Sequence, residues 1–235
     1  MKIGILQAGH TPTDLVEGHG QYTDMFQRLL AGNGFDFETW DVLDDVFPDS
    51  INDADGWLVT GSKFSALDDF PWIRRLEKFL RKCYAAEIPI VGTCFGHQLL
   101  AQALGGRVEK FGGGWGIGRD MYEFGDEPVF LNSWHQDQVT TLPPDAEVTG
   151  SSGFCKFAML SYGSKAISVQ PHPEFDSAFI EGLIETRGVG TVPDDLLDRA
   201  RSDLEQEIDQ QKFARVIAEF FLTSRDTTAP GRSAG

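Results

Sequence analysis

Residues 90–98 read IVGTCFGHQ and place Cys94 between two glycines, where a short apolar run changes into a helical pattern. Glycines at these positions allow a tight turn from a strand into a helix, and such a turn exposes the cysteine side chain at the helix N-terminus. A helix N-terminus favours the thiolate, and the N–H of the next residue can donate to an oxyanion. The stretch therefore predicts a nucleophile elbow, against the general tendency of free cysteines to be small buried hydrophobic residues.

The other two cysteines, Cys83 and Cys155, are not framed by two glycines, and buried thiols are the simpler interpretation for them. An odd number of cysteines without CxxC spacing predicts neither a disulfide framework nor a zinc site. We therefore expect reduced thiols and no bound metal.

On both sides of IVGTCFGHQ, short apolar runs alternate with helical patterns. Strands are expected at residues 2–6, 35–43, 55–62 and 88–94, and helices at residues 22–34 and 71–87. This alternation predicts an α/β fold with a mostly parallel sheet and helices on both faces. Between residues 119 and 171, short β segments are separated by turn residues, which predicts an antiparallel β excursion from the same sheet.

The end of the chain predicts C-terminal helices. Residues 175–187 form one helical pattern and residues 194–222 form a second, long one. We expect a single domain over residues 1–222 and a disordered tail over residues 223–235.

Composition limits the partners. The chain has 235 residues, 41% of them hydrophobic, which suffices for one α/β domain with a sizeable core. Its 20 Lys and Arg residues against 36 Asp and Glu residues give a formal charge of −16. Such a surface repels phosphates and anionic lipid, so no nucleic-acid and no membrane partner is expected. The apolar start is too short for a secretion signal, and no run approaches the roughly 20 apolar residues that span a bilayer, which predicts a cytoplasmic protein.

A thiol nucleophile needs a histidine as base and acid, and five histidines are available. His172, in SVQPHPEF, stands at the end of an apolar strand and is followed two residues on by Glu174. Residues i and i+2 of an extended segment share a face, so Glu174 can hold the imidazole by a hydrogen bond and set its tautomer. His135, in NSWHQDQV, fits either a catalytic base or a structurally satisfied residue. The remaining three are more simply explained as surface or structurally satisfied residues: His10, His19 and His97.

In this order and at these intervals, GTCFGHQ, SWHQDQV and VQPHPE resemble the three signatures of the class I glutamine amidotransferase family. VTGS at residues 59–62 resembles the end of that family's oxyanion strand, and the similarity runs to about residue 185. The resemblance implies a flavodoxin-like α/β fold. It also implies that Cys94 is the nucleophile, His172 the base and acid, and Glu174 the orienting carboxylate.

The same motif matches imply further roles. Backbone at Gly61 and Phe95 would form the oxyanion hole, and Gln98 would bind the amino-acid end of the substrate. The match to SWHQDQV adds three residues to the substrate site: Ser133, Trp134 and His135. The chain is most similar to stand-alone members that resemble the amidotransferase domain of GMP synthase, a group that includes γ-glutamyl peptidases.

The predicted chemistry is hydrolysis of the γ-amide of glutamine or of a γ-glutamyl compound through a thioester on Cys94, without a metal or an organic cofactor. Two alternatives stay open: a glutaminase subunit that delivers ammonia to a separate synthetase chain, and a non-catalytic binder or thiol sensor on the same fold. The intact set of proposed catalytic residues argues against the sensor. The glycine-rich residues 112–118 are interpreted as turns, and the acidic residues 194–209 as a solvated helix face.

Overall fold

The computed structural model describes residues 1–228. In this part of the chain, apolar runs form the parallel half of a nine-stranded sheet, with the strand order β2-β1-β3-β4-β11. These strands are β1 (Lys2–Leu6), β2 (Asp36–Trp40), β3 (Gly56–Val59), β4 (Ile90–Thr93) and β11 (Ala166–Val169). The order is that of flavodoxin-like folds, so the predicted fold class is confirmed. One detail differs: β11 pairs parallel to β4, although its segment was expected in the antiparallel part.

The antiparallel excursion extends the sheet beyond β11 in the order β10-β9-β6-β7. Its strands are β6 (Gly116–Phe124), β7 (Val129–His135), β9 (Glu147–Ser151) and β10 (Met159–Ser161). Two further strands, β5 (Arg107–Lys110) and β8 (Asp137–Thr141), form a separate antiparallel pair.

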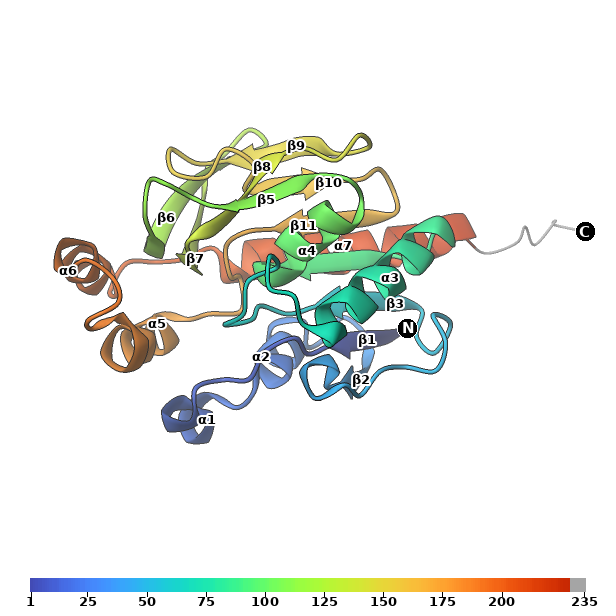
Figure 1. The fold of residues 1–235 in the computed structure, drawn as a ribbon, viewed down its shortest axis with the longest axis horizontal. Coiled ribbons are helices and arrows are strands. Elements are labelled where there is room, and N and C mark those ends of the chain that lie inside the picture. Colours follow the sequence, from blue (N-terminus) through green and yellow to red (C-terminus); the bar gives the residue numbers. More distant parts are fainter. Residues whose placement is uncertain (229–235) are drawn as a thin grey trace, which may run out of the picture.

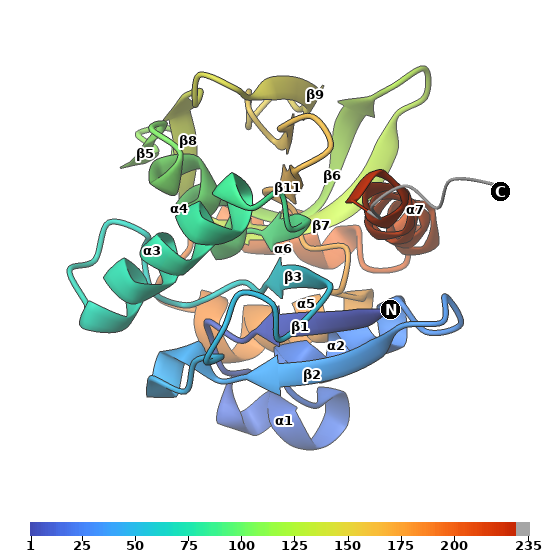
Figure 2. The same ribbon diagram turned by 90° about the vertical axis from the view of Figure 1, so that its right-hand side faces the viewer.

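Helices cover both faces of the sheet. Figure 2 shows α3 (Pro71–Ala85) and α4 (Phe95–Ala103) on one side of the strands and α7 (Gln210–Thr228) on the other. The first face buries Trp57 and Leu76, and the second buries Leu58 and Ile217, together with Phe26 of α2 (Tyr22–Leu29). Neighbouring residues of β3 therefore point to opposite cores, as the alternation of a doubly covered strand requires.

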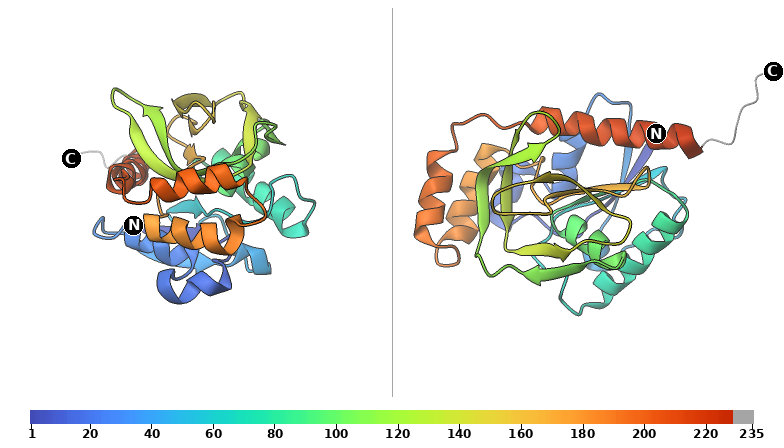
Figure 3. Two further views of the ribbon diagram at one scale, coloured as in Figure 1. Left: turned by 90° about the vertical axis from the view of Figure 1, so that its left-hand side faces the viewer. Right: turned by 90° about the horizontal axis from the view of Figure 1, so that it is seen from above.

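A third group of helices lies beyond the carboxyl ends of the parallel strands, at the left of Figure 1. It consists of α1 (Thr13–His19), α5 (Ser177–Leu183) with the π-helical turn η2 (Ile184–Gly188), and α6 (Asp194–Ser202). The left panel of Figure 3 shows α5 and α6 next to each other at this end. Their apolar side chains form a separate cluster with Phe175 and Ile117. Because ligands bind at the carboxyl edge of such sheets, this cluster forms one wall of any site there.

The structure corrects the long C-terminal helix. Residues 194–222 were expected to be continuous, but α6 ends at Ser202 and α7 begins at Gln210. Between them, Asp209 pairs with β7: its N–H donates to Phe130 O at 2.7 Å, and its carboxylate accepts from Phe130 N at 2.8 Å. This anchor turns the chain, because a helix through Asp209 could not keep both bonds.

Helix α7 continues past residue 222, the expected end of the domain, to Thr228. The rest of the expected tail, residues 229–235, lies outside the described residues. Over the residues that the structure describes, no helix combines the length and apolarity needed to cross a bilayer.

Candidate active site

Cys94 occupies a sharp turn between β4 and α4. Its backbone has φ 52° and ψ −103°, a conformation that non-glycine residues rarely adopt. Its N–H donates to Val169 O at 2.8 Å, and its carbonyl accepts from the N–H of Gln98 at 3.0 Å. The strained backbone is therefore held between β11 and the first turn of α4, which is the arrangement of a nucleophile elbow.

Steric crowding explains why both residues that flank the elbow, Gly92 and Gly96, are glycines. A Cβ on Gly92 would lie 2.6 Å from Gly96 O, and a Cβ on Gly96 would lie 2.5 Å from Val59 O. Real Cβ atoms do not approach backbone this closely, so α4 can start directly against β3 and β4 only without these side chains. The spacing of the glycines thus brings Cys94 to the carboxyl edge of the sheet.

His172 and Glu174 lie beside Cys94. Nδ1 of His172 and Oε1 of Glu174 are 2.7 Å apart, and both side chains are almost completely buried. Cys94 also acts on this imidazole, through its charge and a side-chain hydrogen bond. The structure therefore brings together Cys94, His172 and Glu174, from β4 and from the segment after β11.

The charges around His172 favour its protonated form. Burial alone lowers the pKa of His172, but the charges of Glu174 and Cys94, and hydrogen bonds to both, outweigh burial and raise the pKa to about 10. His172 is consequently protonated at neutral pH, and its proton is available to a leaving group.

The backbone and one ring face of His172 are fixed by neighbours. Its N–H donates to Asn132 O at 2.7 Å, and Nδ2 of Asn132 donates to Phe175 O at 3.0 Å. The ring of Phe175 stacks on the imidazole with 3.8 Å between the ring centroids. These contacts leave the ring little freedom to rotate, which is what a proton-transfer group requires.

Two backbone N–H groups at the site have no partner. The N–H groups of Gly61 and Phe95 donate no hydrogen bond to any described residue. A Cβ on Gly61 would lie 3.7 Å from Cβ of Cys94, so Gly61 lies directly beside the cysteine. Phe95 follows Cys94 at the N-terminus of α4. Unpaired donors beside a thiol are suited to hold a developing oxyanion.

These residues open onto a cavity of about 380 Å³. Cys94, Phe95 and His172 line it, as do three of the predicted substrate residues: Gln98, Trp134 and His135. The side chain of Ser133 is not part of the lining, because its Oγ is hydrogen-bonded to Tyr122 Oη, 2.5 Å away in the interior. Strand β7 turns this side chain inward, and the substrate contact of Ser133 stays a prediction.

Gln98 and His135 are held in fixed orientations. Nε2 of Gln98 donates to Asp137 O at 2.8 Å and to Gln170 Oε1 at 3.0 Å. Nδ1 of His135 lies 3.1 Å from Asp137 O, so this nitrogen carries the proton in the neutral ring. Burial lowers the pKa of His135 to about 4, and the charge on His172 acts in the same direction. His135 is therefore neutral at pH 7.

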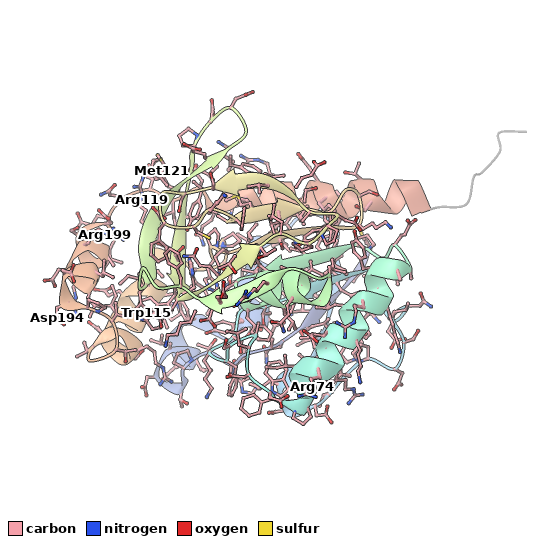
Figure 4. The ribbon with its side chains drawn as sticks, turned by 45° about the horizontal axis from the view of Figure 1, so that its top comes forward. Arg74, Trp115, Arg119, Met121, Asp194 and Arg199 are labelled. Atoms are coloured by element: carbon pink, nitrogen blue, oxygen red, sulfur yellow. The ribbon has the colours of Figure 1, made fainter. Side chains whose placement is uncertain are left out.

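Several lining residues were not found from the sequence. Tyr22 starts α2, Arg187 belongs to η2, and Trp115 precedes β6; Figure 4 shows Trp115 at the end of the molecule where α6 lies. None of them stands in a motif. In the structure, burial and then the charges of Glu174 and Cys94 raise the pKa of Tyr22, so its hydroxyl stays protonated.

One group of possible metal ligands lies next to this cavity. Ligand atoms of His10, Asp41 and Asp44 lie within 4.8 Å of one another. Nε2 of His10 is already hydrogen-bonded to Asp41 at 2.7 Å, so this hydrogen bond explains the pairing of these two residues.

Comparison with known proteins identifies the family of this chain. A crystal structure of a glutamine amidotransferase from Methylobacillus flagellatus superposes with a TM-score of 0.74 at 21% identity, over 100% of this chain and 98% of that one. The family described as Glutamine amidotransferase class-I matches residues 15–181. The chain therefore belongs to the class I glutamine amidotransferase family.

Two similar proteins carry different names. The chain is 25% identical over 241 residues to gamma-glutamyl peptidase 5 of Arabidopsis thaliana, covering 95% of this chain and 96% of that protein. It is 33% identical over 176 residues to a glutamine-hydrolyzing GMP synthase subunit of Haloarcula marismortui, covering 70% of this chain and 86% of that protein.

Proposed function

We propose that this protein hydrolyses the γ-amide bond of glutamine or of a γ-glutamyl compound through a thioester on Cys94. The observation that supports this most directly is the hydrogen-bonded series from Glu174 through His172 to Cys94, with unpaired N–H groups next to the sulfur. A nucleophile, an acid and base, an orienting carboxylate and an oxyanion site are the parts that acyl transfer needs.

The first half-reaction forms the thioester. The thiolate of Cys94 attacks the γ-carbonyl carbon, and the carbonyl oxygen becomes an oxyanion that accepts from the N–H groups of Gly61 and Phe95. His172 then gives its proton to the amine nitrogen as the C–N bond breaks. The amine departs, a γ-glutamyl thioester remains, and His172 is neutral.

The second half-reaction regenerates the enzyme. Neutral His172 takes a proton from water, which attacks the thioester carbon. The tetrahedral intermediate collapses to glutamate and the thiolate of Cys94, and His172 is protonated again. Glu174 stays ionised throughout and stabilises the imidazolium. The residues of this chain supply every proton transfer in the cycle.

The second candidate is a glutaminase subunit that passes ammonia to a separate synthetase. The likeness to the GMP synthase subunit of Haloarcula marismortui favours it. The cavity favours the free-standing hydrolase, because about 380 Å³ lies in the range of about 300–1,000 Å³ that accommodates drug-sized ligands, which are larger than glutamine. A γ-glutamyl compound with a bulky amine part makes better use of this space.

One assay separates the two. The purified protein is incubated with glutamine, γ-glutamyl peptides and γ-glutamyl amines, and the released ammonia or amine is measured. Release without any added protein supports the hydrolase, and release only after a synthetase chain is added supports the role of a glutaminase subunit. Cys94→Ala is the control: the proposal is wrong if this variant retains more than a few per cent of the activity.

A further inference from the structure

The cavity carries positive charge in a strongly negative chain. Lys63, Lys110 and Arg187 line it, whereas the whole chain has a formal charge of −16. None of these three cations forms an ion pair with a described residue. Among the described residues, the lining includes one carboxylate, Asp137, which is hydrogen-bonded to Ser65 Oγ. An anion entering the cavity would therefore meet cations that have no competing partner.

Arg187 lies on the side of the cavity where the leaving group must be. His172 transfers its proton to the amine nitrogen, so the amine part of the substrate lies on the His172 side. On this side, Phe175 stacks on His172, and the ring of Tyr22 follows at 5.7 Å from that of Phe175. Arg187 lines the cavity together with Tyr22 and Phe175, and its charge opposes the rise of the Tyr22 pKa. The rings of Phe175 and Tyr22 thus lie along the cavity wall between His172 and Arg187.

The backbone that carries Arg187 is packed against the cavity wall. Arg187 belongs to the π-helical turn η2, a type of turn that is frequent at functional sites. A Cβ on the next residue, Gly188, would lie 2.6 Å from Leu197 of α6 and 3.4 Å from the ring of Trp134. The turn is therefore held between α6 and a cavity-lining tryptophan, while the Arg187 side chain itself is exposed.

We propose that Arg187 binds a carboxylate on the leaving group, so that the preferred substrate is a γ-glutamyl amide whose amine part is anionic. This rests on the proposed γ-glutamyl hydrolysis. The guanidinium presents paired N–H donors that match a carboxylate, and the aromatic rings of Trp115 and Trp134 offer apolar surface to the rest of the leaving group. Glutamine, which releases ammonia, leaves this part of the cavity unused.

Binding to the inert Cys94→Ala protein tests the inference without turnover. The ligands are γ-glutamylglycine, γ-glutamylglycinamide and the γ-glutamyl amide of ethylenediamine, whose amine parts are negative, neutral and positive. Isothermal titration calorimetry should give the order negative, then neutral, then positive. We expect γ-glutamylglycine to bind about 1.4- to 5-fold more tightly than the glycinamide, the range for a charge pair exposed to solvent, and less so at high salt.

Two substitutions in the same background assign the preference. Arg187→Met should bring the ratio of the two affinities close to one, and Arg187→Glu should make the positive ligand the best of the three. The matched control is Arg199→Met: Arg199 is exposed on α6, lies outside the cavity lining and forms no ion pair with a described residue (Figure 4). It should leave the order and the ratio unchanged.

The outcomes distinguish this inference from the proposed function. Equal binding of the negative and neutral ligands, binding of none of the three, or a preference that survives both Arg187 substitutions overturns the inference. If the wild type hydrolyses neither glutamine nor any of the three ligands while Cys94→Ala still binds γ-glutamylglycine through Arg187, the proposed hydrolysis is wrong and the anion site stands.

Discussion

Gly61 packs directly against His172: a Cβ on Gly61 would lie 2.7 Å from Cε1 of the imidazole. Gly61 follows β3 by two residues, whereas His172 follows β11, and β4 with Cys94 lies between these strands. The absence of a side chain at Gly61 therefore lets the proposed oxyanion donor and the proposed acid reach the same carbonyl group.

Gly61→Ala should lower kcat more than it lowers stability. The new methyl group has to displace the His172 ring or the Gly61 backbone, and either movement removes one of the proposed catalytic contacts. Loss of one oxyanion donor typically costs about 100- to 1,000-fold in kcat. The measurements are steady-state amine release and the thermal melting temperature.

A second glycine provides the control for this prediction. A Cβ on Gly153 would have no heavy atom within 4 Å, so Gly153→Ala should leave kcat and melting temperature close to wild type. Wild-type turnover in Gly61→Ala would contradict the assigned oxyanion hole.

Glu174→Gln should reduce kcat/KM and shift its alkaline limit to lower pH. In the proposed mechanism, His172 needs its proton to expel the amine, and its raised pKa of about 10 keeps that proton bound well above neutral pH. Glu174 is the first of the groups that raise this pKa, so its neutral replacement lowers the pKa, and the proton is lost at lower pH. Loss of the Glu174 charge, which stabilises protonated His172, should cost about 100- to 10,000-fold in kcat/KM. A pH profile whose alkaline limb stays in place would show that Glu174 does not support this proton.

The three cysteines should differ in alkylation. Burial raises the pKa of Cys83 and of Cys155 to about 12, and these side chains are 0% and 1% exposed. Cys94 is also largely buried, at 5% exposure and not exposed as the elbow predicted, but it lines the cavity and lies beside protonated His172. Iodoacetamide at mildly acidic pH should therefore modify Cys94 first, as peptide mass spectrometry can measure. Equal labelling of all three in the folded protein would contradict an activated nucleophile, and prior urea unfolding is the control that should abolish the difference.

The sequence was sufficient for the elbow and for most of the parallel sheet, because both depend on local patterns. Glycines at residues 92 and 96 permit the close approach of α4, and apolar runs mark β1, β3 and β4. The pairing of His172 with Glu174 followed from i, i+2 geometry, and their nearness to Cys94 followed from the family resemblance.

Long-range contacts explain what could not be predicted. Residues 204–207 are good helix formers, but the bonds between Asp209 and Phe130 of β7 fix the chain away from a continuous helix. Ser133 lies within a signature motif, yet its side chain points toward Tyr122. Arg187 stands in no motif. The packing of η2 against Trp134 brings it to the cavity wall, and no local pattern predicts this contact.

The strained backbone of Cys94 predicts a stability difference between two inactive variants. At φ 52° and ψ −103°, glycine is the residue with least strain, and relief of such strain is worth about 1–3 kcal/mol. Glycine loses more backbone entropy on folding, which costs about 0.5–1 kcal/mol relative to alanine. Cys94→Gly should therefore be more stable than Cys94→Ala by about 1 kcal/mol, which corresponds to a melting temperature about 2–4 °C higher for a chain of this size. The same exchange at Ala101, a buried residue inside α4, should have the opposite sign, because Ala101→Gly relieves no strain there. Denaturant titration of the three variants measures these differences. If Cys94→Ala equals or exceeds Cys94→Gly in stability, the elbow stores no strain, and the glycines at residues 92 and 96 alone account for the position of the thiol.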